Sequence, residues 1–559
     1  MTTSQDSTDN PRSTEIAGPA IDRRRFLGGV GMLAAMPTVA SLLAACSSES
    51  SASKSSGSSN TGTLVYAMEI AGIPALDPHT ALGSGSSLLQ AILPMFEGLV
   101  TDYLNIPGRT RFGQPHLAES WKLLDGGKTW EWSLRPNVKF HDGTPWNADA
   151  AIWNFQRLYD KNSPQYYPDA AANMVDFMPG PILSLEKVDD LTFRMSLPIA
   201  RPLDEEFGWV WMVSPSAVEK LGNAGFGVAP VGTGGMKFDN LVSGQQFEMV
   251  RNDKYWGTPY KMERLIVRPI ADSTARTNAL ISGTVNMAVE ISGESLAALR
   301  SRGEVVNLSQ RIHTWDVLFN TQAPPFNNKM VRQALNYAIN REALATDILK
   351  GIATPMNQIV QPGNAWYNPD IKPYTYDPAK AKSMLAQAGY PHGFQSHWLG
   401  PINGSGNLDP VAILEFIQGN LKDIGVNISL TTYEWTDYLS FFFKGYPPGV
   451  DAMAISYGPQ WTYWWGLLFA PQYLPPAGAL NVGKYTNHAN DPLYDKALAL
   501  AASDPAQSAK YIQQIAANVW DDAPWLFVVH GDNVRVTTPN VTGYINTADW
   551  LFGWSTIGT

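Results

Sequence analysis

The chain has 559 residues, of which 44% are hydrophobic and only 16% are charged, and it contains a single cysteine. That length corresponds to about three or four domains at roughly 100–200 residues each, and the composition excludes a disordered or collagen-like protein. One cysteine excludes a disulfide framework and a cysteine-based metal cluster. The net charge of −10 argues against nucleic acid as a partner, because phosphate binding needs a basic face.

Residues 1–45 are predicted to be an export signal. The run Arg23–Leu27 has the twin-arginine pattern, the stretch Gly28–Ala45 is apolar with many small residues, and Leu43–Cys46 matches the lipobox of bacterial lipoproteins. The alternative is a buried N-terminal helix with an inert cysteine. A diacylated and N-acylated Cys46 carries enough acyl chains for stable anchoring. We therefore expect export by the twin-arginine route and lipid anchoring at the extracytoplasmic face of the bacterial cell membrane.

Residues 46–62 are predicted to be a tether, because Ser47–Gly62 is rich in serine and has almost nothing to bury. Beyond the tether the sequence contains no apolar run of the roughly 18 residues that a membrane span requires.

The body of the chain mixes strand and helix signals. Leu64–Met68 is predicted to be a strand, and Trp121–Leu134 a hairpin, because Asp125-Gly126-Gly127 favours a turn and the following residues alternate in polarity. An apolar stripe over Val331–Ile339 predicts a helix.

Three Asp-Pro pairs predict helix starts, with an N-cap carboxylate before a proline in the first turn. They are Asp377-Pro378, Asp491-Pro492 and Asp504-Pro505. The first helix should end near Gly389. We expect an α/β architecture in more than one lobe.

No common catalytic motif is present in the sequence, which lacks G-x-S-x-G, H-E-x-x-H and G-x-G-x-x-G. Gly127-Lys128-Thr129 lacks the earlier glycine of a P-loop, and His141-Asp142-Gly143 is interpreted as a turn. We expect no enzymatic activity, no metal site and no cofactor.

Several stretches resemble the family 5 extracellular solute-binding proteins, the peptide/nickel/opine class that supplies ABC importers. The matching stretches are Leu117–Asn154, Pro230–Val289, Val317–Arg341, Tyr376–Tyr390 and Asp521–Phe527. They occur in the family's order and cover most of residues 63–545.

The resemblance implies a two-lobed fold of the type II periplasmic-binding-protein class, with a hinge that the chain crosses near His313–Asn320 and near Pro524–His530. The domains that follow are lobe one over residues 63–313, with an inserted subdomain near 99–232, then lobe two over 314–527, and a return to lobe one over 528–559. Ligand would contact both lobes and favour the closed form, which a membrane permease recognises. We expect a monomer.

The resemblance also implies where a ligand binds. The predicted ligand-binding residues are Trp435, Tyr457, Gln460, Trp461, Tyr463 and, in lobe one, Gly72. Peptide-binding members carry an acidic residue where this chain has Gln460, some carry one where it has Gly72, and oligopeptide binders carry basic residues at the positions of Phe442 and Ala454. The aromatic positions are kept, whereas the charged anchors are absent.

Two ligand classes follow from this pattern. The family favours an oligopeptide, whereas the loss of ion-pairing anchors disfavours a zwitterion and favours a neutral oligosaccharide or capped peptide stacked on aromatic faces. For Trp461–Trp465 the alternative is ordinary packing of a helix start against its lobe, and Trp464 and Trp465 cannot both face the same way on a helix. Trp209 and Trp211, or Tyr166 and Tyr167, are candidates to roof the pocket, with ordinary packing as the alternative. A sensory solute-binding lipoprotein is the alternative to import.

Overall fold

The structure is a computed structural model. It describes residues 62–81, 86–101, 113–174, 181–404, 406–442, 444–458, 461–474, 480–547 and 551–559. The predictions for the signal, for lipidation of Cys46 and for Gln460 lie outside the described residues.

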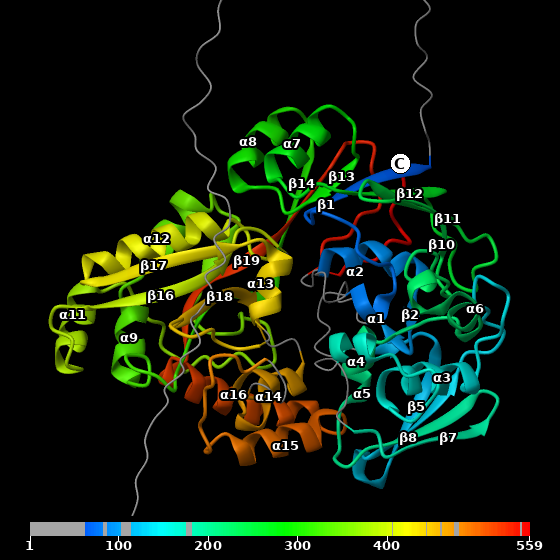
Figure 1. Ribbon diagram of the computed structural model, residues 1–559, viewed down its shortest axis with the longest axis horizontal. Helices are drawn as coiled ribbons and strands as arrows, with labels where there is room; N and C mark the ends of the chain where they lie inside the picture. The colour runs from blue at the N-terminus through cyan, green and yellow to red at the C-terminus, as the bar shows by residue number, and fades with distance from the viewer. Residues whose placement is uncertain are drawn as a thin grey trace, which may run out of the picture. The chain divides into compact units, whose positions relative to one another are not determined.

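A large mixed sheet runs through the body of the chain (Figure 1). Its strands, in spatial order, are β10 (Met236–Val242), β11 (Gln246–Arg251), β12 (Arg264–Pro269), β1 (Thr63–Met68), β13 (Met287–Val289), β19 (Trp525–Thr537), β14 (Val305–Phe319), β18 (Ala452–Tyr457), β16 (Phe394–Pro401) and β17 (Val426–Tyr433), and β15 (Ala353–Pro355) pairs with β19. β1 is parallel to β12 and β13, and β16 is parallel to β17 and β18. The predicted strand at Leu64–Met68 is confirmed.

Two long antiparallel strands, β14 and β19, join the two halves of this sheet. Residues Val305–Gln310 of β14 pair with the end of β19, and Thr314–Leu318 pair with its beginning; the register shifts between them. On one flank β19 pairs with β13, and on the other β14 pairs with β18. Each strand is therefore continuous through both halves of the sheet.

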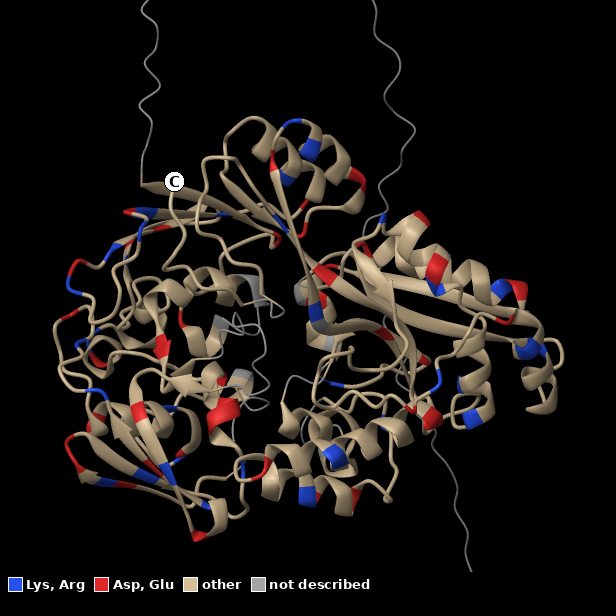
Figure 2. Cartoon of the chain, turned by 180° about the vertical axis from the view of Figure 1, so that it is seen from behind, with Lys and Arg blue, Asp and Glu red and all other residues tan. Residues whose placement is uncertain are grey.

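A separate four-stranded sheet is formed by β5 (Ala118–Leu124), β6 (Thr129–Leu134), β8 (Thr192–Ser196) and β7 (Ser184–Asp189). The predicted hairpin is confirmed as β5 and β6, with Trp130 and Trp132 fully buried on the inner face. Lys122 and Arg194 both pair with Glu131, at 3.0 and 2.8 Å, and Figure 2 shows the alternation of basic and acidic residues on this sheet. Two separate two-stranded sheets come from neighbouring parts of the sequence. One pairs β2 (Glu97–Gly98) with β9 (Trp211–Met212), and the other pairs β3 (Val100–Thr101) with β4 (Gln114–Pro115).

The helices of the first 301 residues are α1 (Pro78–Ala81), α2 (Ser86–Ile92), α3 (Ala148–Tyr159), α4 (Pro168–Met174), α5 (Leu203–Glu206), α6 (Pro215–Phe226), α7 (Ser273–Ile281) and α8 (Gly293–Ser301). The later ones are α9 (Lys329–Tyr337), α10 (Arg341–Ala343), α11 (Pro378–Gln387), α12 (Pro410–Asp423), α13 (Trp435–Phe442), α14 (Thr462–Phe469), α15 (Asp491–Ala501) and α16 (Pro505–Asp522). In the part of the chain that the structure describes, no helix has the length and apolarity to cross a bilayer.

Two of the three predicted Asp-Pro starts are confirmed. The carboxylates of Asp377 and Asp504 accept from the backbone N–H three residues on, at 2.8 and 3.1 Å. At the third pair the prediction is wrong by one residue, because Asn490 is the N-cap and Asp491 is already helical. The carboxylate of Asp491 instead lies 2.9 Å from the ring of His488.

Candidate functional site

An unbroken series of aromatic rings runs from α13 through β18 and the start of α14. Consecutive ring centroids are 5.1 to 6.3 Å apart, within the range of favourable aromatic contact. We call this series the aromatic series. In order, its members are Trp435, Tyr438, Phe442, Tyr457, Trp464, Trp461 and Trp209. The structure thus brings the predicted Trp435, Tyr457 and Trp461 into one connected set.

One end of the series is fixed by a tight packing contact. The backbone N–H of Trp435 donates to the side chain of Asn403 at 3.0 Å, where α13 begins. The indole ring lies over Gly404, whose φ is +105°, and a Cβ added there would come within 2.3 Å of the ring. A side chain at position 404 would collide with the indole, so glycine is needed for Trp435 to lie where it does.

Toward its other end the series passes through α14, every residue of which is buried. Trp464 packs against Tyr457 and Trp461, whereas Trp465 packs against Trp366 at 6.1 Å. The prediction that Trp464 and Trp465 face different ways is confirmed. Trp465 belongs to the packing of its own region rather than to the aromatic series.

A charged segment meets the start of α14 from the N-terminal half of the chain. The guanidinium of Arg201 lies 3.5 Å from the ring centre of Tyr463 and pairs with Glu206 at 2.8 Å. The backbone N–H of Thr462 donates to Oε2 of Glu205 at 3.2 Å. All of these side chains are buried, so charged groups lie at the start of α14, although the sequence pattern indicates no charged anchor.

Burial makes the carboxyl groups of this segment weak acids. Burial, with the nearby Asp204 as the next cause, raises the pKa of Glu205 to about 8. Burial also raises the pKa of Glu206 to about 7, although the guanidinium of Arg201 opposes the rise. Glu205 is therefore largely protonated and neutral at pH 7, and its O–H group can donate a hydrogen bond.

The remaining predicted residues lie elsewhere. Gly72 stands in the loop after β1, and open space surrounds its α-carbon; no described contact joins it to the aromatic series. The Asp77 carboxylate nearby is held by Arg157 at 2.6 Å. The side chains of Phe442 and Ala454 are fully buried, so neither position faces open space.

Among the candidate roof residues, Trp209 is itself the last member of the aromatic series, with its ring centre 5.3 Å from that of Trp461. Trp211 packs behind it at 5.8 Å. Tyr167 lies under the guanidinium of Arg157, which is an ordinary packing position.

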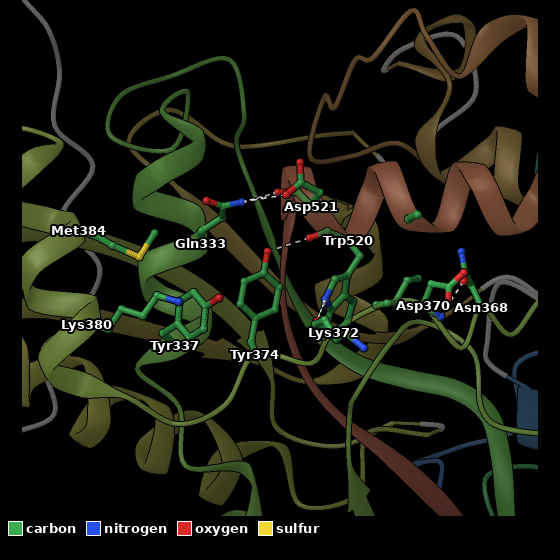
Figure 3. Close-up of a pocket in the computed structure, with 12 residues that line it drawn as sticks. Gln333, Tyr337, Asn368, Asp370, Lys372, Tyr374, Lys380, Met384, Trp520 and Asp521 are labelled. Atoms are coloured by element: carbon green, nitrogen blue, oxygen red, sulfur yellow. Dashed lines mark hydrogen bonds between the residues drawn. The ribbon is translucent and has the colours of Figure 1, made fainter.

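A cavity of about 420 Å³ lies away from the predicted residues (Figure 3). It is bordered by α9, α11 and α16, with Tyr337, Tyr374 and Trp520 among its aromatic walls. Its polar groups bind one another: the Tyr374 hydroxyl donates to the carbonyl of Trp520 at 2.8 Å, and Gln333 donates to Asp521. None of the predicted ligand-binding residues lines it. Within the described residues no cluster of histidine, cysteine, aspartate and glutamate is arranged to hold a metal ion.

Comparison with known proteins identifies the class to which this fold and site belong. Residues 113–473 match the family described as bacterial extracellular solute-binding proteins, family 5 Middle. The chain belongs to this family, which confirms the resemblance found in the sequence. Its fold is the two-lobed α/β fold of periplasmic binding proteins, and its function is to capture a solute and deliver it to an ABC transporter.

Individual relatives cover nearly the whole chain. Heme-binding protein A of Haemophilus influenzae is 31% identical over 554 residues, spanning 92% of this chain and 97% of the relative. The glutathione-binding protein GsiB of Escherichia coli strain K12 is 30% identical over 453 residues, spanning 77% and 82%. Among solved structures, the periplasmic binding protein DppA of Helicobacter pylori, in complex with the peptide STSA, has a TM-score of 0.77 and 25% identity, with 89% of this chain and 98% of the other covered.

Proposed function

We propose that this protein is a lipid-anchored receptor that closes over a peptide-type solute and passes it to the permease of an ABC importer. The proposed residues of the site are Trp435, Tyr457, Gln460, Trp461 and Tyr463, with Gly72 at the edge of lobe one. The proposed lobes are 63–313 and 314–527, with the return over 528–559. Binding involves no covalent step, and the receptor works as a monomer on the extracytoplasmic face of the membrane.

The observation that carries the proposal is the meeting of aromatic and charged groups at the start of α14. Tyr463 lies two residues after Trp461, a member of the aromatic series, and its ring lies under Arg201. A peptide presents amides, apolar side chains and charged termini together. Aromatic faces suit the apolar parts, while a buried guanidinium and carboxyl groups offer partners that a terminal charge needs when it leaves water.

The same observation argues against the neutral oligosaccharide that the sequence pattern favours. The charged anchors absent near Gln460 have a counterpart in Arg201, Glu205 and Glu206, which come from the N-terminal half of the chain. Relatives that bind glutathione or a short peptide agree with this choice.

The test is mass spectrometry of the molecule released by denaturation from purified protein, followed by calorimetry. The titration panel is the peptide STSA, the same peptide with blocked termini, glutathione and a neutral tetrasaccharide. We expect the free peptide or glutathione to bind at least tenfold more tightly than the blocked peptide. Preferential binding of the tetrasaccharide or the blocked peptide would reject the peptide-type assignment, and recovery of cleaved peptide would reject binding without chemistry.

A further inference from the structure

Direct contacts join the segment Arg201–Trp209 to the residues Trp461–Tyr463, which lie in different proposed lobes. We call the first the acidic segment and the second the α14 start. The contacts include Thr462 N–H to Glu205, Arg201 over Tyr463, and Trp209 against Trp461. A hydrogen bond, a cation–π contact and an aromatic pair therefore join the acidic segment directly to the α14 start.

The interface between the two proposed lobes continues beyond Arg201. A cavity of about 180 Å³ is lined by Arg201 and by the hairpin turn at Gly126 and Gly127 on one side, and by Leu498 and Ser503 at the end of α15 on the other. The acidic segment therefore lies in an interface between the proposed lobes, and this interface would separate if the lobes opened.

We propose that Arg201 and Glu205 are positioning residues that hold the α14 start against lobe one in the closed form, and that Glu205 does so as the neutral acid, so that closure takes up a proton. This inference rests on the proposed function, since it assumes that capture requires closure. We call the contacts that Arg201 and Glu205 make with the α14 start the latch. The latch would make closure depend on pH, while the predicted ligand-binding aromatic residues lie in lobe two.

The charge around Glu205 explains why the neutral acid is required. Arg201 already pairs with Glu206, while Glu205 meets a backbone N–H. Among the described residues, the titratable groups around this cluster are Asp204, Glu206 and Arg201 from its own segment, Tyr463 from α14 and Tyr159 from α3. Ionising Glu205 would add its charge to the buried acids Asp204 and Glu206, while Arg201 is the only guanidinium among these groups. Such an addition is costly in a desolvated interface.

Closure of the lobes should be favoured at low pH. In the open form Glu205 meets water and titrates near its ordinary pKa of about 4.3, whereas in the closed form burial raises that pKa to about 8. Between these values closure binds a proton that the open form has released. The ratio of closed to open molecules therefore falls by up to about tenfold for each pH unit in this window, and the stabilisation of the closed form is fully present only below the lower value.

The experiment measures closure by pulsed electron resonance between spin labels at K220C on α6 and K422C on α12, in the full chain carrying C46S. In the parent we expect a larger short-distance population at pH 5.5 than at pH 8.5. E205Q should lose most of that difference, because the amide is neutral at both values. E342Q, which changes an exposed glutamate on α10, should behave like the parent.

A second variant covers the case in which E205Q does not fold. Glu205→Asp shortens the reach to the Thr462 N–H and should lower the short-distance population at both pH values. A parent without pH dependence, or E205Q with the parent's pH dependence, overturns the proposal. The peptide STSA then separates the two hypotheses: binding of the peptide with pH-independent closure rejects the latch alone, whereas pH-dependent closure without binding of any panel member rejects the peptide-type function alone.

Discussion

At the scale of single residues, the sequence predicted the aromatic residues of the proposed site but not the charged residues that lie beside them. Trp435, Tyr457 and Trp461 stand out in a sequence because their residue types are few and their spacing matches a family pattern. Glu205 and Thr462 are 257 positions apart, and local periodicity carries no information about such a pairing. The signal that was present is the run Asp204-Glu205-Glu206 beside Arg201, in a chain with only 16% charged residues.

Trp435→Ala is expected to weaken solute binding by about 1–3 kcal/mol, the usual loss for a contacting aromatic. The measurement is calorimetry with the solute that purifies with the protein. Trp121→Ala is the matched control, because Trp121 lies on the four-stranded sheet, against Trp132. Equal affinity of both variants and the parent would show that the site lies elsewhere.

Gly404→Ala tests whether the backbone sets the plane of Trp435. The added Cβ would come within 2.3 Å of the indole at a φ of +105°, so the ring or the loop must move. Gly449→Ala is the matched control, because its φ of +77° is also left-handed but nothing lies within 4 Å. Both variants carry backbone strain of about 1 kcal/mol, and we expect only Gly404→Ala to reduce affinity as well, by threefold or more. Equal affinity of the two variants in calorimetry would contradict this.

At the scale of elements, the sequence predicted helix starts well where a single side chain decides the local structure. Asp377 and Asp504 cap their helices as predicted, because a carboxylate before a proline has an N–H three residues on within reach. At Asp491 the same dipeptide failed, since His488 lies within reach of its carboxylate and Asn490 became the cap. The Asp-Pro dipeptide alone does not show whether the aspartate will cap the helix or contact a neighbouring side chain.

This difference gives a matched pair of variants. Asp504→Ala removes the carboxylate that accepts from Gln507 N–H and should destabilise the protein by about 0.5–2 kcal/mol. Asp491→Ala removes only a contact with the exposed His488 and should cost less than half as much. The midpoints of thermal unfolding of both variants, measured at one pH and heating rate, check the order. A larger loss from Asp491→Ala would contradict the assignment of the caps.

At the scale of the whole molecule, residues far apart in the sequence form one sheet. β1 pairs with β12 and β13, about 200 positions later, and β19 returns at the end of the chain to pair with β13, β14 and β15. Periodicity predicts a strand but not its neighbours. The family resemblance predicted a two-lobed fold with two hinge crossings, but not this strand order. The hinge positions, 313–320 and 524–530, remain predictions; they fall on β14 and β19, the two strands continuous through both halves.

Asp316 offers a test of how this shared strand responds to pH. It is fully buried on β14, next to the Thr314 hydroxyl, and burial raises its pKa well above the ordinary value. The unfolded chain releases this proton near pH 4, whereas the folded chain keeps it, so the protein loses stability as the pH rises above that value. Asp316→Asn keeps the shape and removes the titration.

The gain in unfolding midpoint of Asp316→Asn over the parent should therefore be larger at pH 8 than at pH 5. The pH effects of Glu205 and Glu206 are common to both proteins and cancel in this difference. Asp437→Asn is the control, because it changes an exposed carboxylate in the first turn of α13, and its effect should be the same at both pH values. If Asp316→Asn shifts the midpoint equally at pH 5 and pH 8, Asp316 is ionised in the folded protein, and the strand that joins the two halves carries a charge at its centre.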